Sequence, residues 1–243
     1  VYFIDQTKTK LQFVKWFPQN YFFENHFISS FNIGNEPLAN TLEHYESILT
    51  LMPLSYSTGI VHFRLGQIQA RILQDYTGAN KSYEAALKSN PSQSLINKIN
   101  LQVGEMLLLS GNFKEAEKYY KPVGNQNIEK NTVQYLKSLL FQQKIDKSIS
   151  FLDSVITELN PNHILFNDLL EIHDLLISNY VDGTKDDKLA LKLFFNAESL
   201  IYQNKNSEAL SILEKIFSQH PDALIRPLSS LRLAILLTEF IIF

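Results

Sequence analysis

Proline recurs along this chain at a nearly constant interval, and that interval most limits how the chain can fold. Five of the eight prolines each follow a run with helical apolar spacing, where proline can end a helix without disrupting its interior. These five are Pro18, Pro53, Pro91, Pro161 and Pro221. The first two intervals between them are similar, the third is about twice as long, and the turn-like stretch VGNQN at 123–127 lies where the unmarked boundary is expected. The sequence therefore predicts a repeat of about 35 residues.

Each period contains two helices joined by a short turn. The run INKINLQVGEMLLLSG places Ile99, Val103, Met106 and Leu107 on one stripe, and Gly111 then breaks the helix. The following stretch NFKEAEKYYKPV supplies a second amphipathic helix. The repeat unit is therefore predicted to be a helical hairpin.

Small residues mark the places where the two helices of a hairpin must approach closely. Over 92–126 the first helix carries Gly104, and the second carries Ala116, Tyr120 and Val123. The preceding hairpin repeats this design with Gly66, Ala79, Tyr83 and Ala86. With the glycine at the turn and the closing proline, this pattern resembles the tetratricopeptide repeat (TPR), a helical hairpin of about 34 residues. The resemblance is clearest over 54–126 and looser over 127–161 and 187–221.

The resemblance implies an all-α fold, namely an α-solenoid in which antiparallel helix-turn-helix repeats stack as a right-handed superhelix. We expect one TPR-like repeat domain over 1–243. Its predicted parts are a partial repeat at 1–18, repeats at 19–53, 54–91, 92–126 and 127–161, an irregular helix and loop at 162–186, a repeat at 187–221 and a partial repeat at 222–243. The irregular part is expected because the stretch between Pro161 and Pro221 is too short for two units.

Composition and charge exclude several classes of protein. The net charge of −3 gives no basic field, so we expect no nucleic-acid partner. The most apolar stretch, LRLAILLTEFIIF at 231–243, is interrupted by Arg232 and Glu239 and is shorter than the roughly 20 apolar residues of a membrane span. We therefore expect a buried helix there. The absence of cysteine fits a cytoplasmic location and a bacterial periplasmic or envelope location equally well.

The sequence offers little for catalysis. It contains no Walker loop, dinucleotide fingerprint, nucleophile elbow or His-Glu-x-x-His pair, and its six histidines show no metal-ligand spacing. Glu171, His173 and Asp174 are close in sequence, but residues so spaced mostly diverge around a helix, so we interpret them as a partly solvated face. We expect no catalytic residues, no metal and no cofactor, and hence no enzyme.

The TPR resemblance implies a binding role for the concave wall that the first helices would form. A protein or peptide partner would lie along this wall. The candidate residues are Phe63, Gln67, Arg71, Leu101, Glu105, Leu108, Val133, Lys137 and Leu140. The alternative for Phe63, Leu101 and Leu108 is ordinary core packing. The apolar chain ends form a second docking candidate.

Three classes of function are open from the sequence. The first is a non-catalytic scaffold that binds a peptide or partner protein along the concave groove. The second is a regulatory repeat module cut from a larger enzyme, which would suit ends that fall inside a repeat. The third is an accessory protein of bacterial envelope assembly, because the hairpin KLFFNAESLIYQNKNSEALSILEKIFSQHPD is similar to repeats of such proteins.

Overall fold

The computed structural model describes residues 35–120 and 128–242. Within these two ranges the chain forms eleven α-helices, one π-helix and no strand, so the predicted all-α, α-solenoid fold class is confirmed. No helix in the described ranges is both long and apolar enough to cross a membrane. The expectations for residues 1–34 and 121–127 lie outside the described residues.

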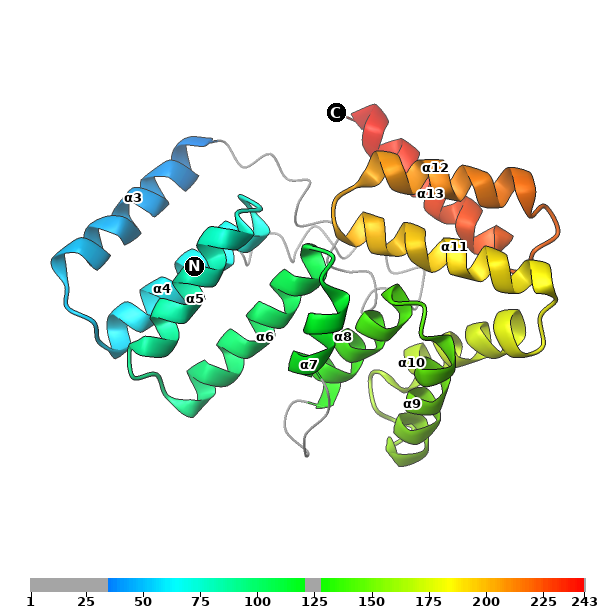
Figure 1. Ribbon diagram of the computed structural model, residues 1–243, viewed down its shortest axis with the longest axis horizontal. Helices are drawn as coiled ribbons and strands as arrows, with labels where there is room; N and C mark the ends of the chain where they lie inside the picture. Colours follow the sequence, from blue (N-terminus) through cyan, green and yellow to red (C-terminus); the bar gives the residue numbers. More distant parts are fainter. Residues whose placement is uncertain (1–34, 121–127, 243) are drawn as a thin grey trace. The chain divides into compact units, whose positions relative to one another are not determined.

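The described helices group into two compact units, which we call the N-terminal unit and the C-terminal unit. The N-terminal unit contains α3 (Asn35–Leu51), α4 (Tyr56–Arg71), α5 (Tyr76–Lys88), α6 (Gln93–Leu109) and α7 (Phe113–Tyr120). The C-terminal unit contains α8 (Ile128–Phe141), α9 (Ile145–Glu158), α10 (Phe166–Leu176), the π-helix Ile177–Val181, α11 (Lys185–Tyr202), α12 (Asn206–Gln219) and α13 (Arg226–Ile242). Consecutive helices run antiparallel as hairpins in each unit (Figure 1).

Similar backbone turns join the two helices of three hairpins. Gly111, Gln143 and Asn204 each have a positive φ, of 80°, 57° and 60°. In each case the next amide N–H donates to the carbonyl oxygen five residues earlier, at 2.8, 3.0 and 2.9 Å. This is the left-handed helix end that satisfies the last carbonyl groups of a helix. Glycine occupies that position in only one of the three hairpins.

The two helices of each N-terminal hairpin meet at a glycine and a tyrosine. A Cβ on Gly66 of α4 would lie 2.6 Å from the ring of Tyr83 on α5. On Gly104 of α6 it would lie 2.7 Å from the ring of Tyr120 on α7. Both tyrosines are 1% exposed, so each ring fills the space that the missing glycine side chain leaves.

The C-terminal unit departs from regular hairpins at α10. This helix packs against α9 and continues directly into the π-helix Ile177–Val181, which contacts α11. Gly183 follows the π-helix, and a Cβ there would lie 2.2 Å from the carbonyl oxygen of Asn179. Thr184 then caps α11 through a reciprocal pair of hydrogen bonds with Asp187. The chain thus enters α11 from an irregular helix inside the range 162–186.

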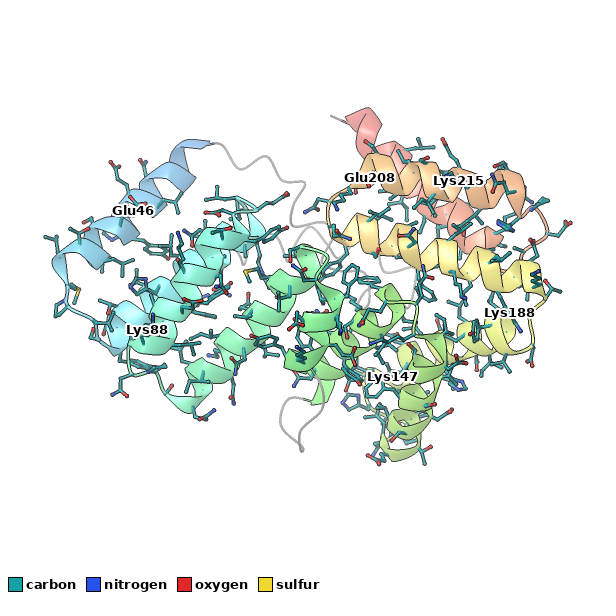
Figure 2. The ribbon with its side chains drawn as sticks, in the orientation of Figure 1. Glu46, Lys88, Lys147, Lys188, Glu208 and Lys215 are labelled. Carbon is teal, nitrogen blue, oxygen red and sulfur yellow. The ribbon has the colours of Figure 1, made fainter. Side chains whose placement is uncertain are left out.

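The second helices of the hairpins carry charged outer faces. Figure 2 labels Lys88 on α5, Lys147 on α9, and Glu208 and Lys215 on α12, and all four are exposed. The opposite faces of these helices hold small and large apolar residues that are fully buried. Among them are Ala79, Ala86, Leu152, Ala209, Leu213 and Ile216. The second helices are therefore amphipathic, as a helix packed on one side requires.

The close approach at Gly104 leads to a stability prediction. In an open helix, Gly to Ala stabilises by up to about 1 kcal/mol, because alanine loses less backbone entropy. Here the added Cβ meets the buried Tyr120 ring, so we expect Gly104→Ala to lower the free energy of unfolding by about 1–3 kcal/mol. Urea unfolding measures this, with Ser94→Ala, an exposed change on the same helix, as control. Equal unfolding midpoints for the two variants would contradict the interpretation.

Candidate functional site

A continuous chain of polar side chains connects α4 and α6 in the N-terminal unit. Arg64 donates to Oε1 of Gln67 at 2.9 Å, and the Gln67 side-chain amide donates to Oε1 of Gln102 at 3.3 Å. The Gln102 side-chain amide donates to Oε2 of Glu105 at 3.2 Å, and Arg71 forms an ion pair with the same oxygen. We call these five residues the α4–α6 polar chain. Three of them, Gln67, Arg71 and Glu105, are groove residues predicted from the sequence.

Exposure falls along this polar chain. Arg64 is exposed, Gln67 and Arg71 are half-buried, and Gln102 and Glu105 are buried. The interhelical bonds hold the half-buried side chains in fixed positions, so a partner would meet a preorganised polar surface. Its more accessible part carries the side chains of Arg64 and Arg71, whereas Glu105 is buried.

The apolar groove candidates of the N-terminal unit lie mainly in its core. Phe63 is 6% exposed and packs against Tyr83 with ring centroids 6.2 Å apart. Leu108 is fully buried. Leu101 is half-buried, and its carbonyl oxygen accepts a hydrogen bond from the Tyr120 hydroxyl at 3.1 Å. The burial of Phe63 and Leu108 agrees with the core-packing alternative for these two residues.

The remaining three groove candidates lie on α8 in the C-terminal unit. Every residue from Thr132 to Phe141 is buried, including the polar Gln134 and Lys137. Val133 and Leu140 belong to the large apolar core of the unit. These three candidates therefore belong to a different unit from the α4–α6 polar chain.

Lys137 belongs to a buried charged cluster that sequence reasoning did not identify. Glu198 on α11 is fully buried and pairs with Arg232 on α13 through two hydrogen bonds, at 2.6 and 3.0 Å. The Lys137 ammonium lies 5.1 Å from the centre of the Tyr202 ring. Burial raises the pKa of the Glu198 carboxyl, and the positive charges of Arg232 and Lys137 oppose that rise. The cluster therefore joins three first helices through charge inside a low-dielectric core.

A recurring spacing could have revealed several of these contacts. Arg71 and Glu105, Glu198 and Arg232, and Asp186 and His220 are each paired at a separation of 34 residues. The period of the repeat thus reappears as the spacing of interacting polar side chains. A search for opposite charges one repeat apart is the signal that would have found the pair on α11 and α13.

The face of α10 is acidic and partly desolvated. Burial, with the nearby Glu171 carboxylate, raises the pKa of Asp168 from 3.8 to about 6. Burial and the Asp174 charge also raise the pKa of Glu171. His173 contacts Asp153 on α9 at 2.9 Å, which ties this helix to its neighbour. In the described parts of the chain, no group of three or more His, Asp and Glu side chains could hold a metal ion.

The Glu198–Arg232 pair predicts a large stability effect. Glu198→Gln keeps the shape of the side chain but removes the buried carboxylate that pairs with Arg232 and is acted on by the charge of Lys137. We expect a loss of about 3–5 kcal/mol in the free energy of unfolding. The double change Glu198→Met with Arg232→Met should cost less, because it removes both members of the hydrogen-bonded ion pair together and leaves Lys137 as the remaining charge of the cluster. Denaturant unfolding of both variants tests this, with the exposed Glu208→Gln as control. A lower free energy of unfolding for the double variant than for Glu198→Gln would contradict the prediction.

The raised pKa of Asp168 predicts a pH-dependent effect of its replacement. Because its folded pKa of about 6 exceeds 3.8, the folded state holds the proton more tightly, and stability falls as the pH rises through this window. Asp168→Asn removes that fall. We expect a higher melting temperature than the parent near pH 7 and little difference near pH 4. Melting curves at both pH values test this, with the exposed Asp222→Asn as control, and an equal shift at both would contradict it.

Comparison with known proteins adds one finding. Residues 34–150, just under half of the 243-residue chain, match the family model described as "Soluble NSF attachment protein, SNAP". That family consists of α-helical solenoid proteins, so the match supports the helical-repeat part of the TPR resemblance without naming the TPR itself. No curated protein and no solved structure matches the chain. The matched range includes α3 to α7 and most of the α8–α9 hairpin, and therefore the whole α4–α6 polar chain.

Proposed function

We propose that this chain is a non-catalytic adaptor that holds a partner protein, and that the α4–α6 polar chain is part of its contact surface. The observation that carries the proposal is the match of residues 34–150 to a family whose description is attachment to NSF. An adaptor provides shape and surface rather than reacting groups. A stack of helical hairpins is suited to that task.

Charge favours a partner segment with acidic groups at this surface. Arg64 is exposed and Arg71 half-buried, whereas the one carboxylate of the α4–α6 polar chain, Glu105, is buried and paired. Complementary charge mainly improves specificity and the rate of association. Within this proposal Arg64, Gln67, Arg71 and Leu101 contact the partner. Phe63 and Leu108 support them from the core.

Charge reversal at Arg64 tests the proposal, with purified NSF as the probe. We expect the full chain to bind NSF in a biosensor titration, and Arg64→Glu to weaken binding at least tenfold, about 1.4 kcal/mol. The matched control is Lys81→Glu, the same change of charge at an exposed position on α5, and it should bind like the parent.

Two results would contradict the proposal. Absence of saturable NSF binding by the parent chain would remove the adaptor role in this form. If Arg64→Glu and Lys81→Glu lowered the affinity for NSF equally, binding would depend on the net charge of the chain and not on the α4–α6 polar chain. Circular dichroism melts of each variant establish that both remain folded.

A further inference from the structure

The hydroxyl group of Tyr83 is buried and has no hydrogen-bond partner among the described residues. Tyr83 as a whole is 1% exposed, and burying a hydroxyl group without a hydrogen bond costs free energy. Phenylalanine would fill the same space without that cost. A buried polar group of this kind in a folded protein calls for an explanation, and a role in binding is one.

Tyr120 occupies the matching place in the next hairpin, and its hydroxyl group does have a partner. It donates to the carbonyl oxygen of Leu101 at 3.1 Å. The atoms nearest to a Cβ on Gly104 include the Tyr120 hydroxyl oxygen, at 3.0 Å, whereas those nearest to a Cβ on Gly66 are carbon atoms of the Tyr83 ring. The interval from glycine to tyrosine is also one residue longer in the first of these hairpins. The two rings therefore lie differently on their glycines, and the hydroxyl group of Tyr83 donates to no described carbonyl group.

Tyr83 lies close to the ion pair of the α4–α6 polar chain. Its ring belongs to the same core cluster as Ala70 and Met106. These two residues are the direct sequence neighbours of Arg71 and Glu105. Burial raises the pKa of Tyr83, the charge of Arg71 lowers it, and the charge of Glu105 raises it. The hydroxyl group is therefore near enough to both members of the ion pair to be affected by their charges.

Arg71 is the more exposed member of that ion pair. Its side chain is 24% exposed, whereas the side chain of Glu105 is 7% exposed. An acidic group of a partner that binds Arg71 therefore competes with Glu105 for the guanidinium group. Taking a cation away from a buried carboxylate is costly unless another donor replaces it. The hydroxyl group of Tyr83 is a buried donor close to the place where that replacement is needed.

We propose that Tyr83 is a positioning residue of the partner-binding surface. When an acidic side chain of the partner draws Arg71 away from Glu105, the Tyr83 hydroxyl group donates a hydrogen bond to the Glu105 carboxylate. This inference rests on the proposed function of the α4–α6 polar chain. The hydroxyl group then stabilises the complex, although it adds nothing to the stability of the free chain.

Replacement of Arg71 imitates the bound arrangement without a partner, so melting temperatures of the full chain test the role of Tyr83. In the parent chain, Tyr83→Phe should leave the melting temperature unchanged or raise it, because the hydroxyl group has no partner there. In the Arg71→Met variant, Tyr83→Phe should lower the melting temperature by about 3 °C or more, because it then removes a hydrogen bond to a carboxylate. The matched control is Tyr120→Phe, which should have the same effect with and without Arg71→Met, because its hydroxyl group donates to Leu101.

Binding of NSF supplies a second measurement, which does not require the Arg71→Met variant to fold. Tyr83→Phe should weaken NSF binding in the biosensor titration by about tenfold without lowering the melting temperature. The inference is overturned if Tyr83→Phe lowers the melting temperature equally with and without Arg71→Met. It is also overturned, with the proposed function left standing, if Tyr83→Phe binds NSF like the parent while Arg64→Glu binds more weakly. If the parent chain does not bind NSF, the proposed function fails, and the melting temperatures alone decide the role of Tyr83.

Discussion

In the N-terminal unit, the packing of a tyrosine ring against a glycine of the neighbouring helix sets the geometry of each hairpin. Gly66 and Gly104 let their helices approach until the rings of Tyr83 and Tyr120 occupy the space of a Cβ. Because a hairpin buries only one side of each helix, this approach also fixes which faces remain for the next hairpin. The interhelical bonds from Gln67 to Gln102 and from Arg71 to Glu105 form on those remaining faces. The polar surface proposed for partner binding is therefore a product of hairpin packing.

The two units use charge differently at comparable places. In the N-terminal unit, Arg71 is half-buried and its carboxylate partner is buried, so one side of the pair stays near solvent. In the C-terminal unit, Glu198 and Arg232 are both buried, with Lys137 close enough to act on the Glu198 pKa. A pair near the surface contributes little to stability, whereas a buried pair is costly to break. The first arrangement suits recognition and the second suits a fixed connection between helices.

Much of the fold could be predicted because proline, glycine and apolar spacing are local signals. Gly111 does begin the turn of its hairpin, and Ala116 and Tyr120 are buried. The turns at Gln143 and Asn204 have the same backbone without glycine, so composition did not reveal them. The π-helix was not predicted from the sequence either, because a backbone hydrogen bond that spans five residues instead of four needs no particular side chain. For the candidate site, Phe63 and Leu108 show the limit. An apolar residue on a first helix can face either the groove or the core, and the spacing of apolar residues in the sequence does not distinguish these two positions.

The buried cluster at Glu198 has a consequence for how this sequence can change over time. Glu198 and Arg232 are both buried and are bonded to each other, so a substitution at Glu198 alone or at Arg232 alone breaks this pair inside the core. Related sequences are then expected to keep both residues or to replace both. The two positions should therefore covary among related sequences, although they lie 34 residues apart in the chain. Selection would then act on the pair that links α11 to α13 and not on either residue alone.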